Sequence, residues 1–285
     1  MSVKRLGVVG SGIMGSGVAE VAAKAGIEVI LRSRSQVTAD AMVAGLEKSL
    51  VKQVERGKLE ASERDTILGR VRAVTDLGEL AECDLVLESI VEDLAVKKHL
   101  FGELDRVVRE GAILATNTST LPVVEMAMET GRPELVCGIH FFNPAPVMPL
   151  IEVVRAITTS NETVAAVREF AETCGKNPVE VRDQAGFIVN ALLFPYLNNA
   201  VKLLDAGVAN REDIDAAMMD GCNFPMGPLA LLDLVGLDTS LAIIEALYAE
   251  FKDPNYVPAP LLRRMVSAER YGRKSGRGFF EYRKK

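Results

Sequence analysis

The 285-residue chain contains no tryptophan, two histidines and four cysteines. The cysteines lie 37 to 54 residues apart and form no CxxC pair, so their spacing suggests neither a zinc site nor a thioredoxin-like motif. We therefore expect no bound metal, and a reducing compartment, the cytoplasm, as the location of the protein.

The chain also lacks a surplus of positive charge and long apolar runs. Its formal net charge is −6, whereas a nucleic-acid-binding surface needs clustered basic residues to neutralise phosphates. No stretch approaches the roughly 18 consecutive apolar residues of a membrane span. Residues 1–5 lead directly into the apolar run 6–9, which is too short for the core of a signal peptide. We expect neither nucleic acid nor a membrane among the partners.

Strand-like and helical runs alternate in the first part of the chain, and the strand-like runs then stop. The strand-like runs are 6–9, 28–31, 85–88 and 112–116, and helical stretches occupy 16–24, 39–56 and 96–109. Such alternation is typical of βαβ units and a parallel sheet. Later in the chain, 186–205, 211–220 and 241–251 all have helical periodicity, with Pro195 expected to kink the first. The sequence predicts an α/β fold, in which a Rossmann-like doubly wound domain (1–183) precedes an all-helical domain (184–285).

The glycine-rich segment GSGIMG at residues 10–15 follows the first strand and opens the first helix. Gly10 permits a tight turn, Gly12 lets a diphosphate approach bare backbone, and Gly15 lets the helix pack closely on the strand. A helix N-terminus favours the negative charge of a diphosphate. An ordinary glycine-rich turn is the alternative, but the position between strand and helix favours a dinucleotide site that includes Ile13 and Met14.

The end of the second strand bears on which nicotinamide cofactor binds. NAD sites usually carry an acid there to bind the ribose 2′-hydroxyl, yet no Asp or Glu occurs between Glu28 and Asp40. Arg32, Ser33 and Arg34 stand there instead, and arginine suits phosphate oxygens. We predict that NADP(H) is favoured and that NAD(H) is possible; the alternative is that these arginines belong to a solvated loop.

His140 is the candidate general base. Oxidation of a secondary alcohol requires a group that accepts the hydroxyl proton, and neutral imidazole suits this role near pH 7. His140 follows an apolar run and precedes a proline-bearing loop, the setting in which α/β sheets place their chemistry. A lone histidine is more often structural, so the position alone does not decide. His99 lies in a helical stretch and is interpreted as a surface residue.

Several motifs in this order resemble the 3-hydroxyacyl-CoA dehydrogenase family, in particular its short bacterial 3-hydroxybutyryl-CoA dehydrogenases. The resemblance runs from about Arg5 to Tyr282. It is carried by the glycine segment and by VEDLAVK (91–97), NTS (117–119), HFFNP (140–144), IEVV (151–154), GFIVN (186–190), PMGP (225–228) and GRGFFEY (276–282).

The resemblance implies a catalytic group of four residues. His140 corresponds to the family's base and Glu152 to the carboxylate that orients it, which also accounts for a carboxylate in an apolar strand that would be costly if unpaired. Ser119 and Asn190 correspond to the groups that hold the 3-oxygen and the thioester carbonyl. Read without the family, they are a turn serine and a helix asparagine.

Further contacts follow from the same resemblance. Glu92, Lys97 and Asn117 are expected on the cofactor side of the cleft, although Glu92 and Lys97 could be solvated charges. Lys48 and Lys52 correspond to positions that bind CoA phosphates, and their i, i+4 spacing puts them on one helix face, which could equally be solvated.

The sequence departs from the family's pattern at three positions. Ser33 replaces an aspartate that many relatives carry, which favours NADP(H). Ser89 and Thr120 replace residues that are commonly alanine and serine.

The predicted activity is interconversion of (S)-3-hydroxyacyl-CoA, in particular 3-hydroxybutyryl-CoA, and its 3-oxo form by a homodimer. Two alternatives stay open. One is a dehydrogenase for acyl groups on a carrier protein, and the other is a non-catalytic, crystallin-like or cofactor-binding protein.

Overall fold

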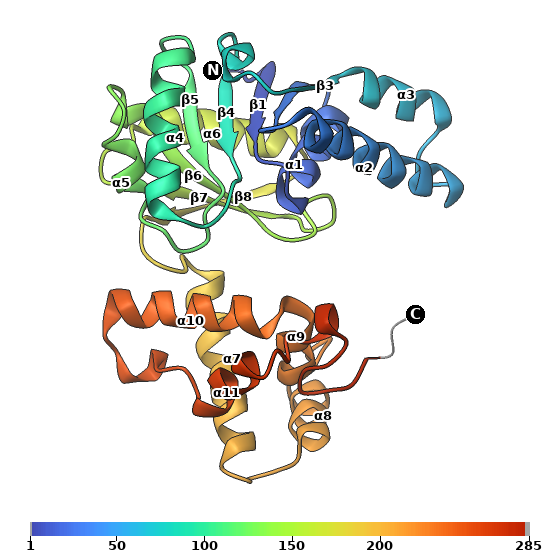
Figure 1. Ribbon diagram of the computed structural model, residues 1–285, viewed down its shortest axis with the longest axis vertical. Helices are drawn as coiled ribbons and strands as arrows, with labels where there is room; N and C mark the ends of the chain where they lie inside the picture. The colour runs from blue at the N-terminus through green and yellow to red at the C-terminus, as the bar shows by residue number, and fades with distance from the viewer. Residues whose placement is uncertain (1, 283–285) are drawn as a thin grey trace. The chain divides into compact units, whose positions relative to one another are not determined.

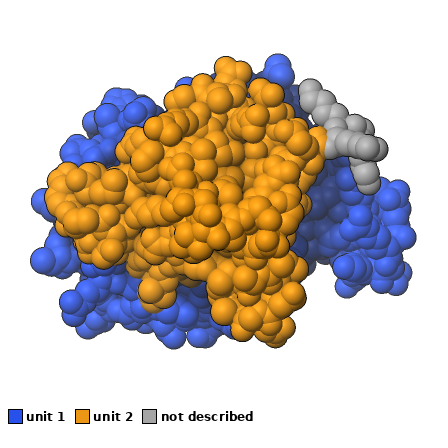
Figure 2. All heavy atoms as spheres, turned by 90° about the horizontal axis from the view of Figure 1, so that it is seen from below, with its two compact units in different colours: residues 1–184 blue, residues 185–285 orange. Residues whose placement is uncertain are grey.

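A computed structural model describes residues 2–282, which form two compact units. The first unit ends at Gln184 and the second begins at Ala185, and Figure 2 colours them separately. The first unit is α/β and the second is helical (Figure 1), which confirms the predicted fold class. No helix within residues 2–282 combines the length and hydropathy needed to cross a bilayer.

One eight-stranded sheet forms the centre of the first unit, in the order β3-β2-β1-β4-β5-β6-β7-β8. All neighbouring strands are parallel except β6 and β7, which run antiparallel. The chain runs outward from β1 through β2 to β3 and then returns to form β4 on the other side of β1. The strand order therefore reverses between β1 and β4. Such a topological switch point is where α/β proteins bind ligands. The strands are β1 (Arg5–Val9), β2 (Glu28–Arg32), β3 (Val71–Val74), β4 (Leu85–Glu88), β5 (Ile113–Thr116), β6 (Val136–Phe141), β7 (Leu150–Arg155) and β8 (Asn177–Arg182).

Helices cover both faces of this sheet (Figure 1). They are α1 (Ile13–Lys24), α2 (Gln36–Glu55), α3 (Ala61–Gly69), α4 (Leu94–Val107), α5 (Val123–Ala127) and α6 (Asn161–Thr173). Side chains of α1, α2 and α6 share one apolar core with the central strands. On α4, Leu100, Phe101 and Leu104 are buried. Covering both faces explains why β4 and β6 are buried along their whole length.

The second unit packs its helices around a separate apolar core. They are α7 (Val189–Asp205), α8 (Arg211–Cys222), α9 (Pro228–Val235), α10 (Leu237–Phe251) and α11 (Pro260–Ser267). Pro195 lies inside α7, as expected from the sequence. The helix begins three residues later than predicted, because Gly186 and Phe187 have positive φ angles of 74° and 47°, which a right-handed helix cannot contain.

Candidate active site

The glycine turn joins β1 to α1 with no room for larger residues at two positions. Gly10 has a φ of 135°, and a Cβ atom there would lie 2.2 Å from the Ser89 carbonyl oxygen. A Cβ at Gly15 would lie 2.3 Å from the Gly10 carbonyl oxygen. A Cβ atom at Gly12, in contrast, would have no other atom within 4 Å. Gly12 is also the N-cap residue of α1. This bare backbone at a helix N-terminus fits the diphosphate of a dinucleotide.

The end of β2 offers hydroxyl and guanidinium groups where an acid would select NAD(H). Ser33 is buried and its hydroxyl is hydrogen-bonded to that of Thr38. Arg32 donates from Nε to the Thr75 carbonyl at 3.2 Å, while Arg34 is exposed. In residues 33–39 the structure has no carboxylate, so a 2′-phosphate would meet no repulsion from this loop.

His140 and Glu152 face each other across two strands. β6 and β7 pair antiparallel with His140 opposite Glu152, and Nδ1 of the imidazole lies 2.7 Å from Oε2 of the carboxylate. Their side chains are 6% and 1% exposed, so the interaction is screened little by water. The ring of Phe142 lies against the imidazole, with centroids 4.6 Å apart. An ionised carboxylate can only accept a hydrogen bond, so a proton on Nδ1 completes this contact and leaves Nε2 as the nitrogen that can accept a proton.

The His140–Glu152 pair and the glycine turn lie at the same edge of the sheet. Val9, Glu88 and Thr116 are register partners across β1, β4 and β5, and Thr116 pairs with Gly138, two residues before His140. The glycine turn follows Val9 directly. Both features therefore lie at the carboxyl edge of the parallel strands, the edge at which α/β sheets carry out their chemistry.

Asn117 ties neighbouring loops together at this edge. Its Oδ1 accepts a hydrogen bond from the backbone N–H of Phe141 at 2.8 Å, and its own backbone N–H donates to the Glu88 carbonyl at 2.8 Å. The Asn117 amide nitrogen lies 3.4 Å from the hydroxyl of Ser89. The residue expected to contact the cofactor thus also fixes the end of β6 next to His140.

Ser119, Glu92 and Lys97 lie together beyond β4 and β5. The backbone N–H of Ser119 donates to Oε1 of Glu92 at 2.9 Å. Lys97, which is 1% exposed, lies 3.3 Å from Oε2 of Glu92 and 2.6 Å from Oε1 of Glu88. The alternative interpretation of Lys97 as a solvated charge is wrong, because its ammonium group is buried between carboxylates.

The remaining expected residues are dispersed. Asn190 belongs to the second unit, where it is buried in the first turn of α7. Lys48 and Lys52 are exposed on α2. His99 is a surface residue as predicted, with 78% of its side chain exposed.

A hollow of about 460 Å³ adjoins the glycine turn within the first unit. It is lined by Gly12 and Ile13, by the α2 face that carries Gly45 and Ser49, and by the loop 143–146 that follows His140 closely in the chain. Lys48 lies three residues beyond Gly45 on the same helix face. The sequence did not predict this hollow, because its lining comes from segments that lie far apart in the chain.

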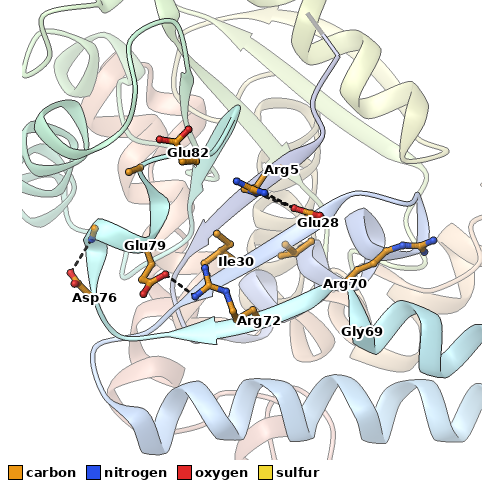
Figure 3. Close-up of a pocket in the computed structure, with 12 residues that line it drawn as sticks. Arg5, Glu28, Ile30, Gly69, Arg70, Arg72, Asp76, Glu79 and Glu82 are labelled. Atoms are coloured by element: carbon orange, nitrogen blue, oxygen red, sulfur yellow. Dashed lines mark hydrogen bonds and ion pairs between the residues drawn. The ribbon is translucent and has the colours of Figure 1, made fainter.

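A larger hollow of about 830 Å³ contains neither the glycine turn nor His140. Arg5 and Glu28, at the starts of β1 and β2, pair at 2.9 Å on its wall, and Arg72 pairs with Glu79 at 2.7 Å (Figure 3). Four of its charged groups are thus engaged in ion pairs with one another, and we assign this hollow no chemistry.

Comparison with known proteins agrees with this geometry. Residues 5–184 match the 3-hydroxyacyl-CoA dehydrogenase NAD binding domain, and residues 186–282 match the 3-hydroxyacyl-CoA dehydrogenase C-terminal domain. The chain is 49% identical to a 3-hydroxybutyryl-CoA dehydrogenase of Mycobacterium tuberculosis over 99% of each chain. It is 40% identical to the mitochondrial hydroxyacyl-coenzyme A dehydrogenase of Homo sapiens, over 99% of this chain and 92% of the relative. A crystal structure of (S)-3-hydroxybutyryl-CoA dehydrogenase from Ralstonia eutropha has a TM-score of 0.97 at 41% identity, over 99% of this chain and 100% of the other.

Proposed function

Because the chain belongs to the 3-hydroxyacyl-CoA dehydrogenase family, we propose that it interconverts (S)-3-hydroxybutyryl-CoA and acetoacetyl-CoA and favours NADP(H). The observation that carries the proposal is the buried His140–Glu152 pair at the sheet edge that also bears the glycine turn. The enzyme class itself, a nicotinamide-dependent 3-hydroxyacyl-CoA dehydrogenase, follows from family membership.

His140 acts as the base in the oxidative direction. Its Nε2 accepts the C3 hydroxyl proton, and Glu152 stabilises the imidazolium that results. A bound nicotinamide supplies the hydride acceptor, so that the alcohol carbon loses a hydride and the alcohol oxygen a proton. Ser119 and Asn190 hold the 3-oxygen and the thioester carbonyl and stabilise the charge on these oxygens. In reduction, His140 returns the proton to the 3-oxygen.

NADP(H) preference rests on the end of β2. Arg34 is exposed, Ser33 stands at the strand end where NAD sites usually carry an acid, and a 2′-phosphate there can accept charge-assisted hydrogen bonds. Steady-state reduction of acetoacetyl-CoA with NADPH and with NADH tests reaction and cofactor together. We expect turnover with a higher kcat/KM for NADPH; a clear preference for NADH would overturn the cofactor proposal.

The same assay separates the other candidate functions. Activity on an acyl-carrier thioester with none on acetoacetyl-CoA would identify a carrier-dependent dehydrogenase. Cofactor binding without turnover on any thioester would identify a storage or crystallin-like protein. His140, Glu152 and Ser119 favour catalysis, because cofactor storage requires none of them.

We assign the CoA phosphates to Lys48 and Lys52 on α2. These exposed ammonium groups lie on the helix that forms one wall of the 460 Å³ hollow. Replacement of both by Ala is expected to raise the KM for acetoacetyl-CoA and to leave the KM for NADPH unchanged. An unchanged KM for the thioester would remove them from the site.

The second unit provides the surface for a homodimer in this proposal. Leu192 and Leu203 on α7 and Val208 after it are 72%, 48% and 68% exposed, and we assign these apolar side chains to the dimer interface. Sedimentation at micromolar concentration is expected to give twice the chain mass; a single-chain mass would contradict the dimer. The free cysteines suit a cytoplasmic location.

A further inference from the structure

Glu88 ends β4 as a completely buried carboxylate in the otherwise apolar run Leu-Val-Leu-Glu. Its Oε1 accepts hydrogen bonds from the backbone N–H of Ile90 at 2.6 Å and from Lys97 Nζ at 2.6 Å. Its Oε2 accepts a hydrogen bond from the hydroxyl of Thr116 at 2.7 Å. A buried charge is tolerated only when it is paired and hydrogen-bonded, and Glu88 meets both conditions.

Lys97 connects this buried carboxylate to Glu92. It lies in the first turn of α4 and reaches Glu92 Oε2 at 3.3 Å, a longer contact than the one to Glu88. The Glu92 side chain is 41% exposed. Without the contact to Lys97 it would be free to adopt several rotamers in solvent. Glu88 therefore fixes the ammonium group, and the ammonium group fixes Glu92.

Glu92 in turn organises the loop that carries Ser119. Its Oε1 accepts hydrogen bonds from the Ser119 backbone N–H and from the Thr118 hydroxyl. That hydroxyl accepts from the backbone N–H of Leu121 at 3.0 Å. Thr116, which donates to Glu88, also accepts from the Thr118 backbone N–H at 3.2 Å. Two paths of polar contacts thus run from Glu88 to the Ser119 loop, one through the Lys97–Glu92 ion pair and one through the hydrogen bonds of Thr116.

We propose that Glu88 is a positioning residue that acts on Ser119 through Lys97, Glu92 and Thr116. The proposal rests on the role of Ser119 in the proposed function. A displacement of about 1 Å at a substrate-positioning group can cost about 100-fold in rate. Loss of the Glu88 carboxylate is therefore expected to act on turnover, although Glu88 is too deeply buried to touch the substrate.

The test compares isosteric Glu88→Gln with wild type in acetoacetyl-CoA reduction and in backbone amide exchange of residues 117–121. We expect kcat to fall about 10-fold to 100-fold and amide exchange in 117–121 to accelerate. A purely structural role would lower the melting temperature without altering exchange in this loop. Wild-type kcat, or a fall in kcat without faster exchange, would overturn the proposal.

Asp105→Asn is the matched control. Asp105 also lies on α4 and pairs with Arg132 at 2.7 Å, outside the proposed site. Its replacement is expected to lower the melting temperature and leave kcat unchanged. If it lowers kcat as much as Glu88→Gln does, general destabilisation explains both results and the proposal fails.

Two further variants keep the outcome decisive. If Glu88→Gln does not fold, the double variant Glu88→Gln/Lys97→Met removes both buried charges together. We expect this double variant to show the same faster amide exchange and lower kcat. A folded double variant with wild-type exchange and kcat would overturn the proposal. Ser119→Ala distinguishes failure of the proposed function from failure of the proposed role of Glu88. Unchanged kcat in Ser119→Ala refutes the role of Ser119 itself, whereas a reduced kcat there with wild-type kcat in Glu88→Gln refutes only the role of Glu88.

Discussion

The imidazole of His140 and the carboxylate of Glu152 are register partners on adjacent antiparallel strands, 2.7 Å apart and nearly inaccessible to water. Backbone pairing sets this geometry, because residues directly opposite on one face of a sheet bring their side chains together. The base is therefore oriented by the sheet itself and not by a mobile loop.

Glu152→Gln is expected to lower kcat about 10²-fold to 10⁴-fold, because a neutral amide neither fixes the imidazole tautomer nor stabilises the imidazolium. Steady-state kinetics in both directions measures the effect. Glu180→Gln is the control, since Glu180 lies on β8 of the same sheet but pairs with Arg155 at the surface. Equal kcat values for the two variants would show that Glu152 has no special role.

The four strand-like runs that the sequence predicted are neighbouring parallel strands of the sheet. The runs 6–9, 28–31, 85–88 and 112–116 correspond to β1, β2, β4 and β5 within one residue at each end. Parallel strands covered by helices are continuous apolar runs and are easily recognised. β3 and β8 form the sheet edges and were missed, because exposed charged residues such as Arg72 and Glu180 interrupt their pattern.

The site was predicted unevenly for a related reason. Glu152 could be paired with His140 because the family resemblance joined them and a buried carboxylate needs a partner. Glu88 carries the same signal, a carboxylate at the end of an apolar strand, but its partners Lys97 and Thr116 lie 9 and 28 residues away on other elements. Only the folded arrangement identifies such partners.

Ser33→Asp is expected to reduce kcat/KM for NADPH by about 10-fold to 100-fold, because the new carboxylate repels a 2′-phosphate and forfeits a charge-assisted hydrogen bond. NADH should be used at least as well as by wild type, since an acid at this position binds the ribose hydroxyls. Kinetics with both cofactors checks the ratio. An unaltered preference would place the cofactor's ribose elsewhere.

Asp105 supplies a pH-dependent contribution to stability. Burial disfavours its ionised form, but hydrogen bonds from the Gly131 backbone N–H and from Arg132 outweigh burial and hold the pKa of Asp105 below its ordinary 3.8. A lowered pKa in the folded state means that the contribution is fully present above the ordinary pKa and is lost as pH falls through the lowered value.

Asp105→Asn is therefore expected to reduce the free energy of unfolding by about 1–3 kcal/mol at pH 7, with a smaller difference from wild type in acid. Urea denaturation at neutral pH and at about pH 3 measures both differences. A difference of the same size at both pH values would contradict this assignment.

Cys222 is expected to be the fast-reacting thiol of the native protein. It is exposed on α8, whereas burial raises the pKa of Cys83, Cys137 and Cys174 to about 12, which leaves almost no thiolate near neutral pH. Mass spectrometry after brief maleimide treatment should show one adduct, and Cys222→Ser should show none. Rapid addition of further adducts to the folded protein would disprove this pattern.

The most direct test of the account is the turnover of His140→Gln and His140→Ala with acetoacetyl-CoA and NADPH. We expect kcat to fall about 10²-fold to 10⁴-fold, while NADPH binding, followed by fluorescence titration, stays within about threefold of wild type because His140 serves the proton and not the dinucleotide. Turnover within about threefold of wild type in either variant would show that the imidazole is not the base.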